Sequence, residues 1–366
     1  MSTTTTYGTL FPTGVVGSLP RSAFVRDLIS GDAEQAGDRE ASLNAAVSYA
    51  VSLQEAAGLD IVTDGEWRRT SYIGVIAQLA HGFETGVNPA DGRPWTTVTA
   101  PVEPKTAGFV AREARFLKSI TSVRTKATLP APALLGERMW DPQRSAGVYP
   151  ERRDFVRACV PILRREAELL VEAGVDVLQI DDPHLCLFVD PEVRAQYDDD
   201  GASEAAFSVE MNNAVLEGVL EGQGSNRSVR KAVHLCRRAG ARVRGEACFA
   251  GGYETILEHL NALQVDQLTM EFTSPGAGEV KALRGLRQDF EIGLGCVSVH
   301  PGQVDTPDTI VERVEAALQV IDKERVLLNP DCGFAPGSAA VVDLDEVYLK
   351  LKNQTEAARR LRQRHG

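Results

Sequence analysis

Two segments of the chain repeat one pattern of apolar and polar positions. In residues 42–66, apolar residues recur at helical spacing up to Gly58, and a short apolar run then leads to acidic residues. Residues 153–183 repeat this order, with Gly174 before the apolar run at 175–180. A helix that ends at a glycine and is followed by a buried, β-branched strand is the αβ half of a βαβ unit.

The same pattern, followed along the chain, predicts eight strands with helices between most of them. Helices are expected, for example, at 255–263, 280–286 and 309–321. Eight parallel strands that alternate with helices indicate a single (β/α)8 TIM barrel over residues 1–366. A doubly wound open sheet is the alternative, because a count of short apolar runs can be off by one or two strands. The expected strands are residues 15–19, 61–64, 126–130, 177–181, 232–236, 268–272, 292–297 and 326–330.

Two longer stretches exceed what a minimal barrel needs. Residues 82–125, rich in Gly, Pro and Thr around PWTTVTAPVEP, predict a hairpin insertion after the second strand. Residues 184–230 follow the fourth strand and predict a long loop and a helix over 205–220. Loops of this length are usually lids or binding elements.

Composition and charge narrow the class of protein. Hydrophobic residues make up 43% and charged residues 25% of the chain, as in ordinary soluble globular proteins. The net charge of −12 argues against a nucleic-acid partner. The N-terminus MSTTTTYGTL has no signal-peptide features, and no apolar run is long enough to cross a bilayer. Six cysteines without paired spacing predict reduced thiols, so we expect a cytoplasmic protein with no membrane partner; association into a homo-oligomer stays open.

Polar residues collect at the predicted carboxyl ends of the strands. In a barrel these ends converge on one mouth, where active sites lie. Carboxylates that end apolar strands would be costly if they were simply buried, which favours a functional role. The residues are Ser18, Asp64, Glu66, Asp181, Asp182, His234, Cys236, Glu271, His300 and Cys332.

The motif VHLC places two metal-binding side chains on one face of a strand. His234 and Cys236 are two residues apart, so both can face one metal ion, although a packed strand end is the simpler reading of this pair alone. Glu271 and Cys332 would end the sixth and eighth strands of the same mouth. One imidazole, one carboxylate and two thiolates form a suitable tetrahedral set for Zn²⁺. Cys248 and Cys296 rank lower, because the first lies in a Gly-rich turn and the second lies inside an apolar strand.

An ordered set of motifs resembles the C-terminal catalytic barrel of the cobalamin-independent methionine synthases, within the larger group that includes the uroporphyrinogen decarboxylase-like barrels. The motifs run from near residue 15 to near residue 337 and therefore span most of the chain. They are VGSLP, TDGEWRR, LQIDDP, VHLC, the isolated Glu271, VSVHPG and NPDCG.

The resemblance implies a role for each matching residue. The family's zinc ligands fall on His234, Cys236, Glu271 and Cys332, and a histidine proposed to move protons matches His300. An amino-acid thiol, homocysteine, would be held near Gly17 and Ser18 and by the carboxylates of Glu66 and Asp181. Without the resemblance, Ser18, Glu66 and Asp181 could equally be strand-end caps or paired surface groups.

These groups suit methyl transfer to a thiol. Coordination to zinc keeps a substrate thiol deprotonated and nucleophilic, because a free thiol with a pKa of about 8.5 is mostly protonated at neutral pH. Glu66 and Asp181 would hold the ammonium group of homocysteine, and His300 would protonate the leaving group. The implied activity is a zinc-dependent S-methyltransferase of methionine biosynthesis.

The alkyl donor stays open. Family members that use a methylated folate have a second, N-terminal barrel and a tryptophan near the third strand, whereas this chain has one barrel and Trp140 somewhat later. It also has Leu187 about where the family has an acidic residue. A methylfolate or a methylcorrinoid could therefore be the donor.

Two other functions remain as alternatives. One is zinc-dependent addition of a thiol to an epoxide, as in epoxyalkane–coenzyme M transferases, whose sulfonate thiol requires cations. Arg68, Arg69, Arg237 and Arg238 leave that open, although most are expected to be solvated. The other is a zinc-free barrel with decarboxylase-like chemistry or binding alone, against which the complete ligand set argues.

Overall fold

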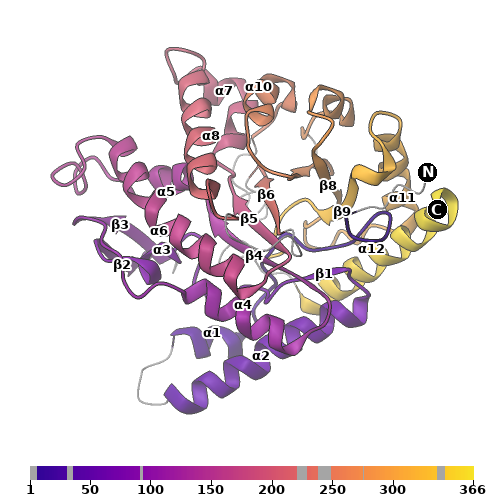
Figure 1. Ribbon diagram of the computed structural model, residues 1–366, viewed down its shortest axis with the longest axis horizontal. Coiled ribbons are helices and arrows are strands. Elements are labelled where there is room, and N and C mark those ends of the chain that lie inside the picture. The colour runs from indigo at the N-terminus through magenta and orange to yellow at the C-terminus, as the bar shows by residue number, and fades with distance from the viewer. Residues whose placement is uncertain are drawn as a thin grey trace.

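A curled sheet of seven parallel strands forms the centre of the computed structural model, which describes residues 6–30, 36–90, 94–220, 229–237, 249–274, 276–335 and 343–366 (Figure 1). The strands are hydrogen-bonded in the order β1-β4-β5-β6-β7-β8-β9, and the six pairs are all parallel. This arrangement is that of a TIM-barrel-like α/β fold. The strands are β1 (Ile61–Val62), β4 (Arg124–Pro130), β5 (Val177–Asp181), β6 (Arg230–Leu235), β7 (Gln267–Glu271), β8 (Glu291–Val297) and β9 (Val326–Pro330).

The first predicted strand, residues 15–19, is not a strand in the structure. Instead the chain just before it makes two isolated parallel bridges, from Thr13 to Leu328 of β9 and from Gly14 to Ile61 of β1. The segment at Thr13 and Gly14 therefore links the two edge strands of the sheet. Beyond it the backbone carbonyls accept hydrogen bonds from side chains, such as Lys126 Nζ on Val15 O, and these bonds take the place of a strand ladder.

Helices cover the sheet and connect its strands. The helix before β1 and the helix before β5 end at Ala57 and Ala173, and the following residues, Gly58 and Gly174, have left-handed φ values of 90° and 81°, as expected for C′ glycines. The helices are α1 (Ala23–Ser30), α2 (Ala36–Ala57), α3 (Ile76–Leu79), α4 (Phe109–Ile120), α5 (Pro132–Met139), α6 (Arg152–Ala173), α7 (Pro191–Arg194), α8 (Ala202–Leu216), α10 (Leu257–Asn261), α11 (Pro307–Leu318) and α12 (Leu344–His365). Short 3-10 turns are η2 (Leu185–Val189), η3 (Tyr253–Ile256), η4 (Val280–Gly285) and η5 (Lys323–Arg325).

The two long stretches have different structures. Within 82–125, strands β2 (Phe83–Val87) and β3 (Pro94–Val98) form an antiparallel hairpin that lies to one side of the central sheet, and α4 returns the chain to β4 (Figure 1). Within 184–230, η2, α7 and α8 follow β5, and residues 221–228 lie outside the described part. The hairpin is held to the body of the molecule by Ser145, whose hydroxyl donates to Val98 O at 2.6 Å.

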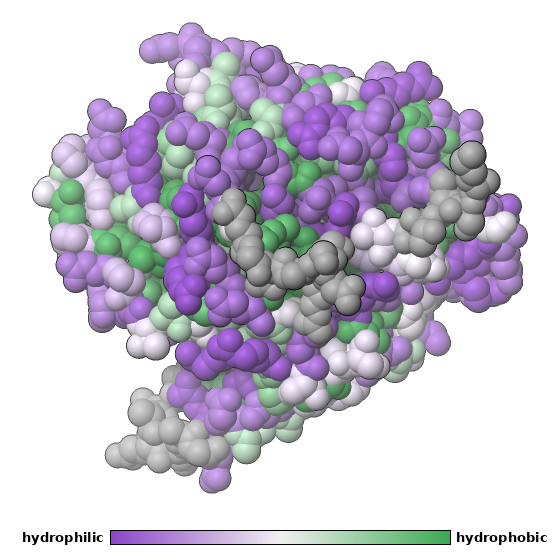
Figure 2. Space-filling model, in the orientation of Figure 1, coloured by the Kyte–Doolittle hydropathy of each residue, from purple (hydrophilic) through white to green (hydrophobic). Residues whose placement is uncertain are grey.

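The surface and the core of the molecule differ in hydropathy. Hydrophilic residues cover most of the face in Figure 2, with hydrophobic residues exposed between them near its middle. The main apolar cluster lies between the sheet and the helices around it, from Phe11 to Leu361. Among the described residues, no helix combines the length and the apolar character that a membrane span requires.

Candidate metal and substrate site

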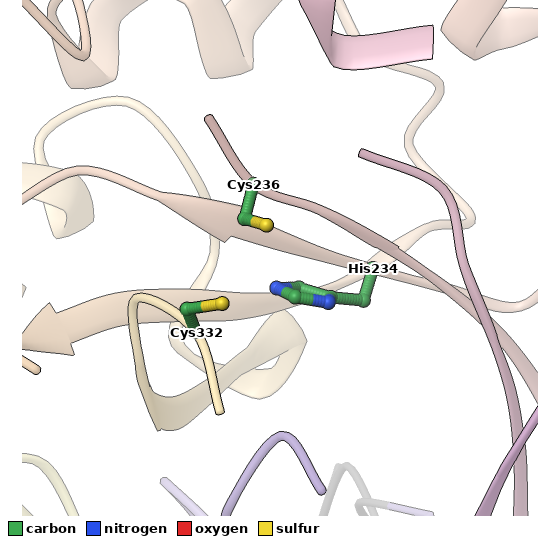
Figure 3. Close-up of side chains that lie close together, drawn as sticks. All are labelled: His234, Cys236 and Cys332. Carbon is green, nitrogen blue, oxygen red and sulfur yellow. The ribbon is translucent and has the colours of Figure 1, made fainter. Parts of the chain in front are cut away.

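Three of the four predicted zinc ligands lie together at the carboxyl ends of their strands. His234 is in β6, Cys236 follows the last residue of β6, and Cys332 follows β9 by two residues. All three side chains are buried, and one ligand atom of each lies within 4.8 Å of the others. Figure 3 shows the two thiols and the imidazole pointing toward one another. The donor set of one imidazole and two thiols matches the chemistry that zinc prefers.

Glu271, the fourth predicted ligand, ends β7 and is fully buried but is not part of this three-residue group. Its Oε2 accepts a hydrogen bond of 2.9 Å from the backbone N–H of Arg237, the residue after Cys236. Its Oε1 accepts a hydrogen bond from the hydroxyl of Ser274. The carboxylate therefore lies beside the cluster but is oriented by two local donors.

Asp181 orients the imidazole of the cluster. This residue ends β5 and is the register partner of His234 in β6. Nδ1 of His234 lies 3.1 Å from Oδ1 of Asp181, and because a carboxylate only accepts, Nδ1 carries the hydrogen of this bond. Nε2 lies 3.4 Å from the carbonyl of Asp331, and once deprotonated it is the nitrogen that can bind a metal ion. A histidine ligand held by a carboxylate through its other nitrogen is typical of metal sites.

Burial and mutual charge shift the pKa values within the cluster. A hydrogen bond from the Cys332 thiol lowers the pKa of Cys236, and the same bond, together with burial, raises the pKa of Cys332. Burial acts to lower the pKa of His234, but the charge of Cys236 and the bond to Asp181 outweigh it and raise this pKa to about 10. The site thus favours a thiolate at Cys236, which is the protonation state of a metal ligand.

The proposed amino-acid site lies around the turn after β1. Ser18 is buried, and its hydroxyl accepts a hydrogen bond of 3.3 Å from the backbone N–H of Ala335. Glu66 is buried and has a left-handed backbone with φ of 58°, which is uncommon for a residue with a side chain. Its Oε1 accepts a hydrogen bond of 2.7 Å from Thr128. A Cβ at Gly17 would lie only 2.8 Å from that oxygen, so the glycine allows the carboxylate to approach the backbone.

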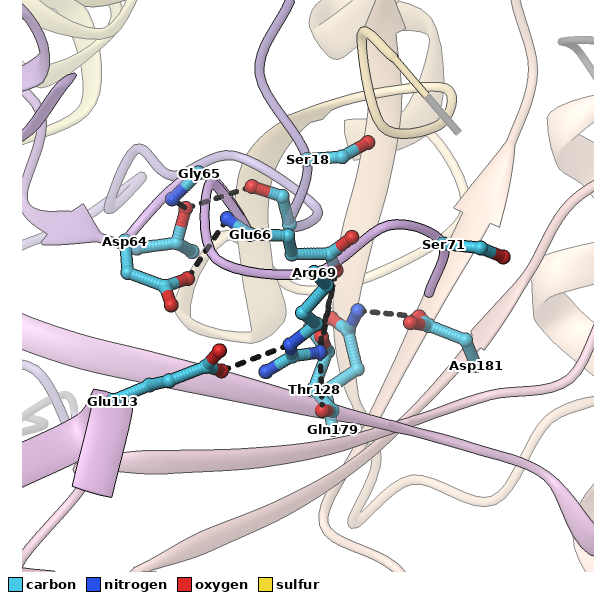
Figure 4. A network of polar contacts seen from close by, with 12 residues as sticks. Ser18, Asp64, Gly65, Glu66, Arg69, Ser71, Glu113, Thr128, Gln179 and Asp181 are labelled. Atoms are coloured by element: carbon cyan, nitrogen blue, oxygen red, sulfur yellow. Dashed lines mark hydrogen bonds and ion pairs between the residues drawn. The ribbon is translucent and has the colours of Figure 1, made fainter. Parts of the chain in front are cut away.

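A buried ion pair between Arg69 and Glu113 lies beside this turn (Figure 4). Nε of Arg69 donates to Glu113 Oε2 at 2.9 Å, and its Nη1 donates to the carbonyl and the hydroxyl of Thr128 at 3.0 Å each. Burial raises the pKa of Glu113 to about 7, although the charge of Arg69 opposes the shift. Burial also raises the pKa of Glu66, and the nearby charge of Asp181 adds to this effect. Glu66 and Asp181 are buried carboxylates near each other, and a bound cation would stabilise both.

Comparison with known proteins assigns the chain to a family. Residues 11–360 match the family model described as the catalytic domain of the cobalamin-independent synthase. This chain belongs to the cobalamin-independent methionine synthase family. It is 28% identical over 365 residues to the uncharacterized protein YxjH of Bacillus subtilis, covering 94% of this chain and 92% of that one. It is also 26% identical over 338 residues to a protein named methionine synthase from Sulfolobus acidocaldarius, covering 89% and 86%.

Solved structures with a similar fold include proteins named as B12-independent methionine synthases. A B12-independent methionine synthase from Shewanella sp. W3-18-1, in complex with selenomethionine, superposes with a TM-score of 0.77 at 21% identity and covers 97% of this chain and 98% of that one. A putative vitamin-B12 independent methionine synthase from Listeria monocytogenes gives a TM-score of 0.67 at 21% identity, covering 96% and 98%. At these identities the likeness establishes the fold.

His300, which matches the family's proton-moving histidine, is exposed in the loop after β8. Its Nδ1 lies 2.9 Å from the carbonyl of Pro301, and its own carbonyl accepts a hydrogen bond of 2.7 Å from Lys350. The structure therefore leaves this imidazole in contact with solvent and does not group it with the thiols. Its predicted part in proton transfer stays a prediction.

None of the three described arginines that left a sulfonate substrate open is exposed, and Arg68 is half-buried. The prediction of solvated side chains is wrong for Arg69 and Arg237, which are both buried. Nη2 of Arg237 donates to the carbonyls of Gly251 and Ala277 at 2.8 Å each, and its guanidinium stacks on the ring of Tyr253 at 4.4 Å. Carbonyl acceptors and an aromatic face replace water, a combination that the sequence does not reveal. Arg238 lies outside the described residues.

Three other residues named in the sequence analysis, Cys296, Trp140 and Leu187, are buried or half-buried. Cys296 is buried in β8 with its thiol 3.7 Å from Asn329 O, whereas Cys248 lies outside the described residues. Trp140 is half-buried, and its Nε1 donates to Tyr149 O at 2.9 Å. Leu187 is buried within η2.

The phenol of Tyr72, which the sequence analysis did not single out, is electrostatically coupled to the cluster. Burial raises the pKa of its phenol well above the ordinary value, and the charges of Cys236, Asp181 and Cys332 add to the shift. The sequence signal was weak, because Tyr72 lies in an irregular segment after the TDGEWRR motif and not at a strand end.

Proposed function

We propose that this chain is a zinc-dependent methyltransferase that transfers a methyl group to the thiol of homocysteine and forms methionine. The observation that supports it most is the group of His234, Cys236 and Cys332, whose ligand atoms lie within 4.8 Å of one another at the ends of β6 and β9. Glu271 is the proposed fourth ligand. Family membership and relatives named methionine synthase support the same reaction.

The proposal takes the chain as one catalytic (β/α)8 barrel with insertions at about 82–125 and 184–230. The bridges of Thr13 to β9 and of Gly14 to β1 support a closed sheet, because they join its two edges. In a barrel of this kind the active site lies at the carboxyl ends of the strands. The thiols, Asp181 and Glu271 all lie at such ends.

The residues present fit a zinc ion. Two thiols and an imidazole nitrogen supply soft and borderline donors, and Asp181 fixes the imidazole through its other nitrogen. Zinc bound there would supply a Lewis acid that keeps the substrate thiol deprotonated at neutral pH.

The residues of this chain would bind and orient the amino acid. The carboxylates of Glu66 and Asp181 would hold its ammonium group, since burial and, to a lesser extent, the charge of Asp181 raise the pKa of Glu66 and a bound cation offsets both effects. Ser18 and the backbone at Gly17 would receive the other end of the amino acid. His300 would deliver a proton to the leaving group of the donor, a methylfolate or a methylcorrinoid.

A thiol acceptor with a sulfonate, which would undergo addition to an epoxide, is the second candidate and has less support. A sulfonate needs cationic partners, and the buried guanidinium groups of Arg69 and Arg237 already donate to acceptors of the protein. The carboxylates at Glu66 and Asp181 would repel a sulfonate. Both features favour an amino acid with an ammonium group.

Metal analysis of purified variants tests the metal site. Wild-type protein should contain about one zinc ion per chain, and Cys332→Ser should contain well under one, because a structural thiolate ligand is lost. Cys296→Ser is the matched control, since that thiol is also buried but lies outside the cluster. Equal zinc contents in Cys332→Ser and wild type would contradict the proposal.

An assay for thioether formation tests the acceptor and the donor. Homocysteine would be mixed in turn with methyltetrahydrofolate, methylcobalamin and a simple epoxide. Product with either methyl donor, lost in Cys332→Ser, is the expected result. If none of the three gives product and homocysteine leaves the spectrum of a Co²⁺-substituted site unchanged, the acceptor assignment is wrong.

A further inference from the structure

Two buried polar residues without an assigned role lie behind the candidate site. Gln179 is the second residue of the motif LQIDDP and the middle residue of β5, and Lys126 is in the neighbouring strand β4. Their side chains are almost completely buried, with exposed fractions of 0% and 2%. A buried ammonium and a buried amide both require hydrogen-bond partners.

Their hydrogen bonds form a chain that ends at the cluster. Nζ of Lys126 donates to Gln179 Oε1 at 3.1 Å and to Val15 O at 2.7 Å. Nε2 of Gln179 donates to Asp181 Oδ1 at 2.8 Å and to Val16 O at 3.1 Å. The same Oδ1 of Asp181 accepts from Nδ1 of His234. Figure 4 shows the amide of Gln179 directed at the Asp181 carboxylate.

The orientation of the amide follows from its partners. An ammonium group can only donate, so the oxygen of Gln179 must face Lys126. The carbonyl of Val16 and the carboxylate of Asp181 accept, so the nitrogen must face them. Three partners therefore require the same orientation, and the reversed amide would place its oxygen against two acceptors. Lys126 thus fixes Gln179 as a donor toward Asp181.

We infer that Gln179, held by Lys126, is a positioning residue that keeps the Asp181 carboxylate in the orientation that bonds to His234. The inference rests on the proposed function, because Asp181 is there both the partner of a metal ligand and a contact of the substrate ammonium. Among the described residues, the hydrogen bonds of the Gln179 amide go to Lys126, Val16 and Asp181. It acts through Asp181 only.

A pair of glutamines allows a matched test. Gln179 in β5 and Gln267 in β7 are both register partners of Ala232 in β6, and both are buried. The amide of Gln267 accepts from Tyr7 and donates to Thr269, at 3.2 and 3.1 Å, and neither of these belongs to the candidate site. Gln179→Met and Gln267→Met remove the same group at equivalent depth.

Zinc affinity, measured by competition with a chromogenic chelator, is the first readout. Gln179→Met should bind zinc about tenfold more weakly than wild type, because a displaced Asp181 no longer acts as the outer partner of His234, and should raise KM for homocysteine. Gln267→Met should keep the wild-type affinity. Equal weakening in both variants, or none in Gln179→Met, would overturn the inference.

Gln179→Glu separates positioning from packing. A carboxylate still accepts from Lys126 and keeps the shape of the side chain, but it cannot donate to Asp181. If the role is positioning, this variant binds zinc no better than Gln179→Met. Recovery of wild-type affinity in Gln179→Glu would show that only the partner of Lys126 matters, and the inference would fail.

A crystal structure of Gln179→Met without metal gives a readout independent of zinc. A changed Asp181 rotamer, with the bond to His234 broken, supports the inference, and an unchanged rotamer overturns it. The result separates the two claims: absence of zinc from the wild-type protein would refute the proposed function, whereas the rotamer decides the role of Gln179. If Gln179→Met does not fold, the same comparison is made on Gln179→Glu.

Discussion

At the scale of single residues, Glu66 has two features that are costly for folding. Its backbone is left-handed, and its carboxylate is buried next to the charge of Asp181. The conformation is held by Arg21, whose Nη2 donates to Glu66 O at 2.7 Å, and by Asp64, whose Oδ1 accepts from Glu66 N at 2.9 Å. Left-handed residues other than glycine cluster at functional sites. The resemblance implies that the carboxylate of Glu66 binds the substrate.

Gly17→Ala should disturb this carboxylate. The new methyl group would lie 2.8 Å from Glu66 Oε1 and 3.1 Å from Thr128 Cγ2, so the Glu66 side chain must move. We expect KM for homocysteine to rise by about tenfold or more, because small displacements of a positioning group are costly. The free energy of unfolding should fall by about 1 kcal/mol.

Gly147→Ala is the control for this substitution, because a Cβ there would meet nothing within 4 Å. Steady-state kinetics and chemical denaturation of both variants provide the comparison. A Gly17→Ala enzyme with wild-type KM would show that Glu66 does not contact the substrate.

At the scale of elements, the apolar pattern predicted seven of the eight strands to within a few residues. The exception, residues 15–19, is apolar and buried as expected, but burial does not determine hydrogen-bond partners. Val16 O accepts from Gln179, Gly17 O from Thr63 and Leu19 O from Trp67. Side chains that lie distant in the sequence satisfy this backbone, and periodicity contains no information about them.

The site could be predicted to the extent that strand ends define it. His234, Cys236 and Cys332 lie together because each follows or ends a parallel strand of one sheet. The buried state of Arg237 could not be predicted, since its acceptors are loop carbonyls at Gly251 and Ala277.

The ion pair between α4 and the turn after β1 should give stability a distinct pH dependence. Burial raises the pKa of Glu113 in the folded protein to about 7, above the ordinary value of 4.5. The folded state therefore binds more protons between these values, and the contribution of Glu113 is complete below pH 4.5 and is lost as the pH rises through 7. The full difference corresponds to about 3 kcal/mol.

Glu113→Gln removes this titrating group. The stability of the metal-free wild type relative to this variant should fall between pH 4.5 and pH 7.5, measured by urea unfolding at several pH values. Glu312→Gln, which removes an exposed carboxyl on α11, should change stability equally at both ends of the range. A constant difference for Glu113→Gln would mean that the carboxyl is ionised throughout.

At the scale of the whole molecule, the C-terminal helix α12 holds the N-terminal segment against the sheet. Near the end of α12, Nε and Nη2 of Arg362 donate to the carbonyls of Leu10 and Phe11 at 2.8 and 3.0 Å. The same N-terminal segment joins β9 to β1 through Thr13 and Gly14 and then continues into Gly17 and Ser18. The two ends of the chain therefore cooperate to place one wall of the candidate site.

Gln354→Leu tests that dependence. Gln354 is fully buried in α12, and its Nε2 donates to Gly14 O at 2.9 Å and to Leu328 O at 2.7 Å, so it joins the N-terminal segment to β9. Leucine has a similar size but cannot donate, and Gly14 O would be left buried without this partner. We expect a loss of about 1–3 kcal/mol in the free energy of unfolding, measured by the urea midpoint. Gln363→Leu, on the exposed side of the same helix, should leave the midpoint unchanged.

Because the N-terminal segment leads directly to Gly17 and Ser18, KM for homocysteine should rise in Gln354→Leu as well. A loss of stability with unchanged KM would mean that α12 stabilises the sheet but does not position the substrate site.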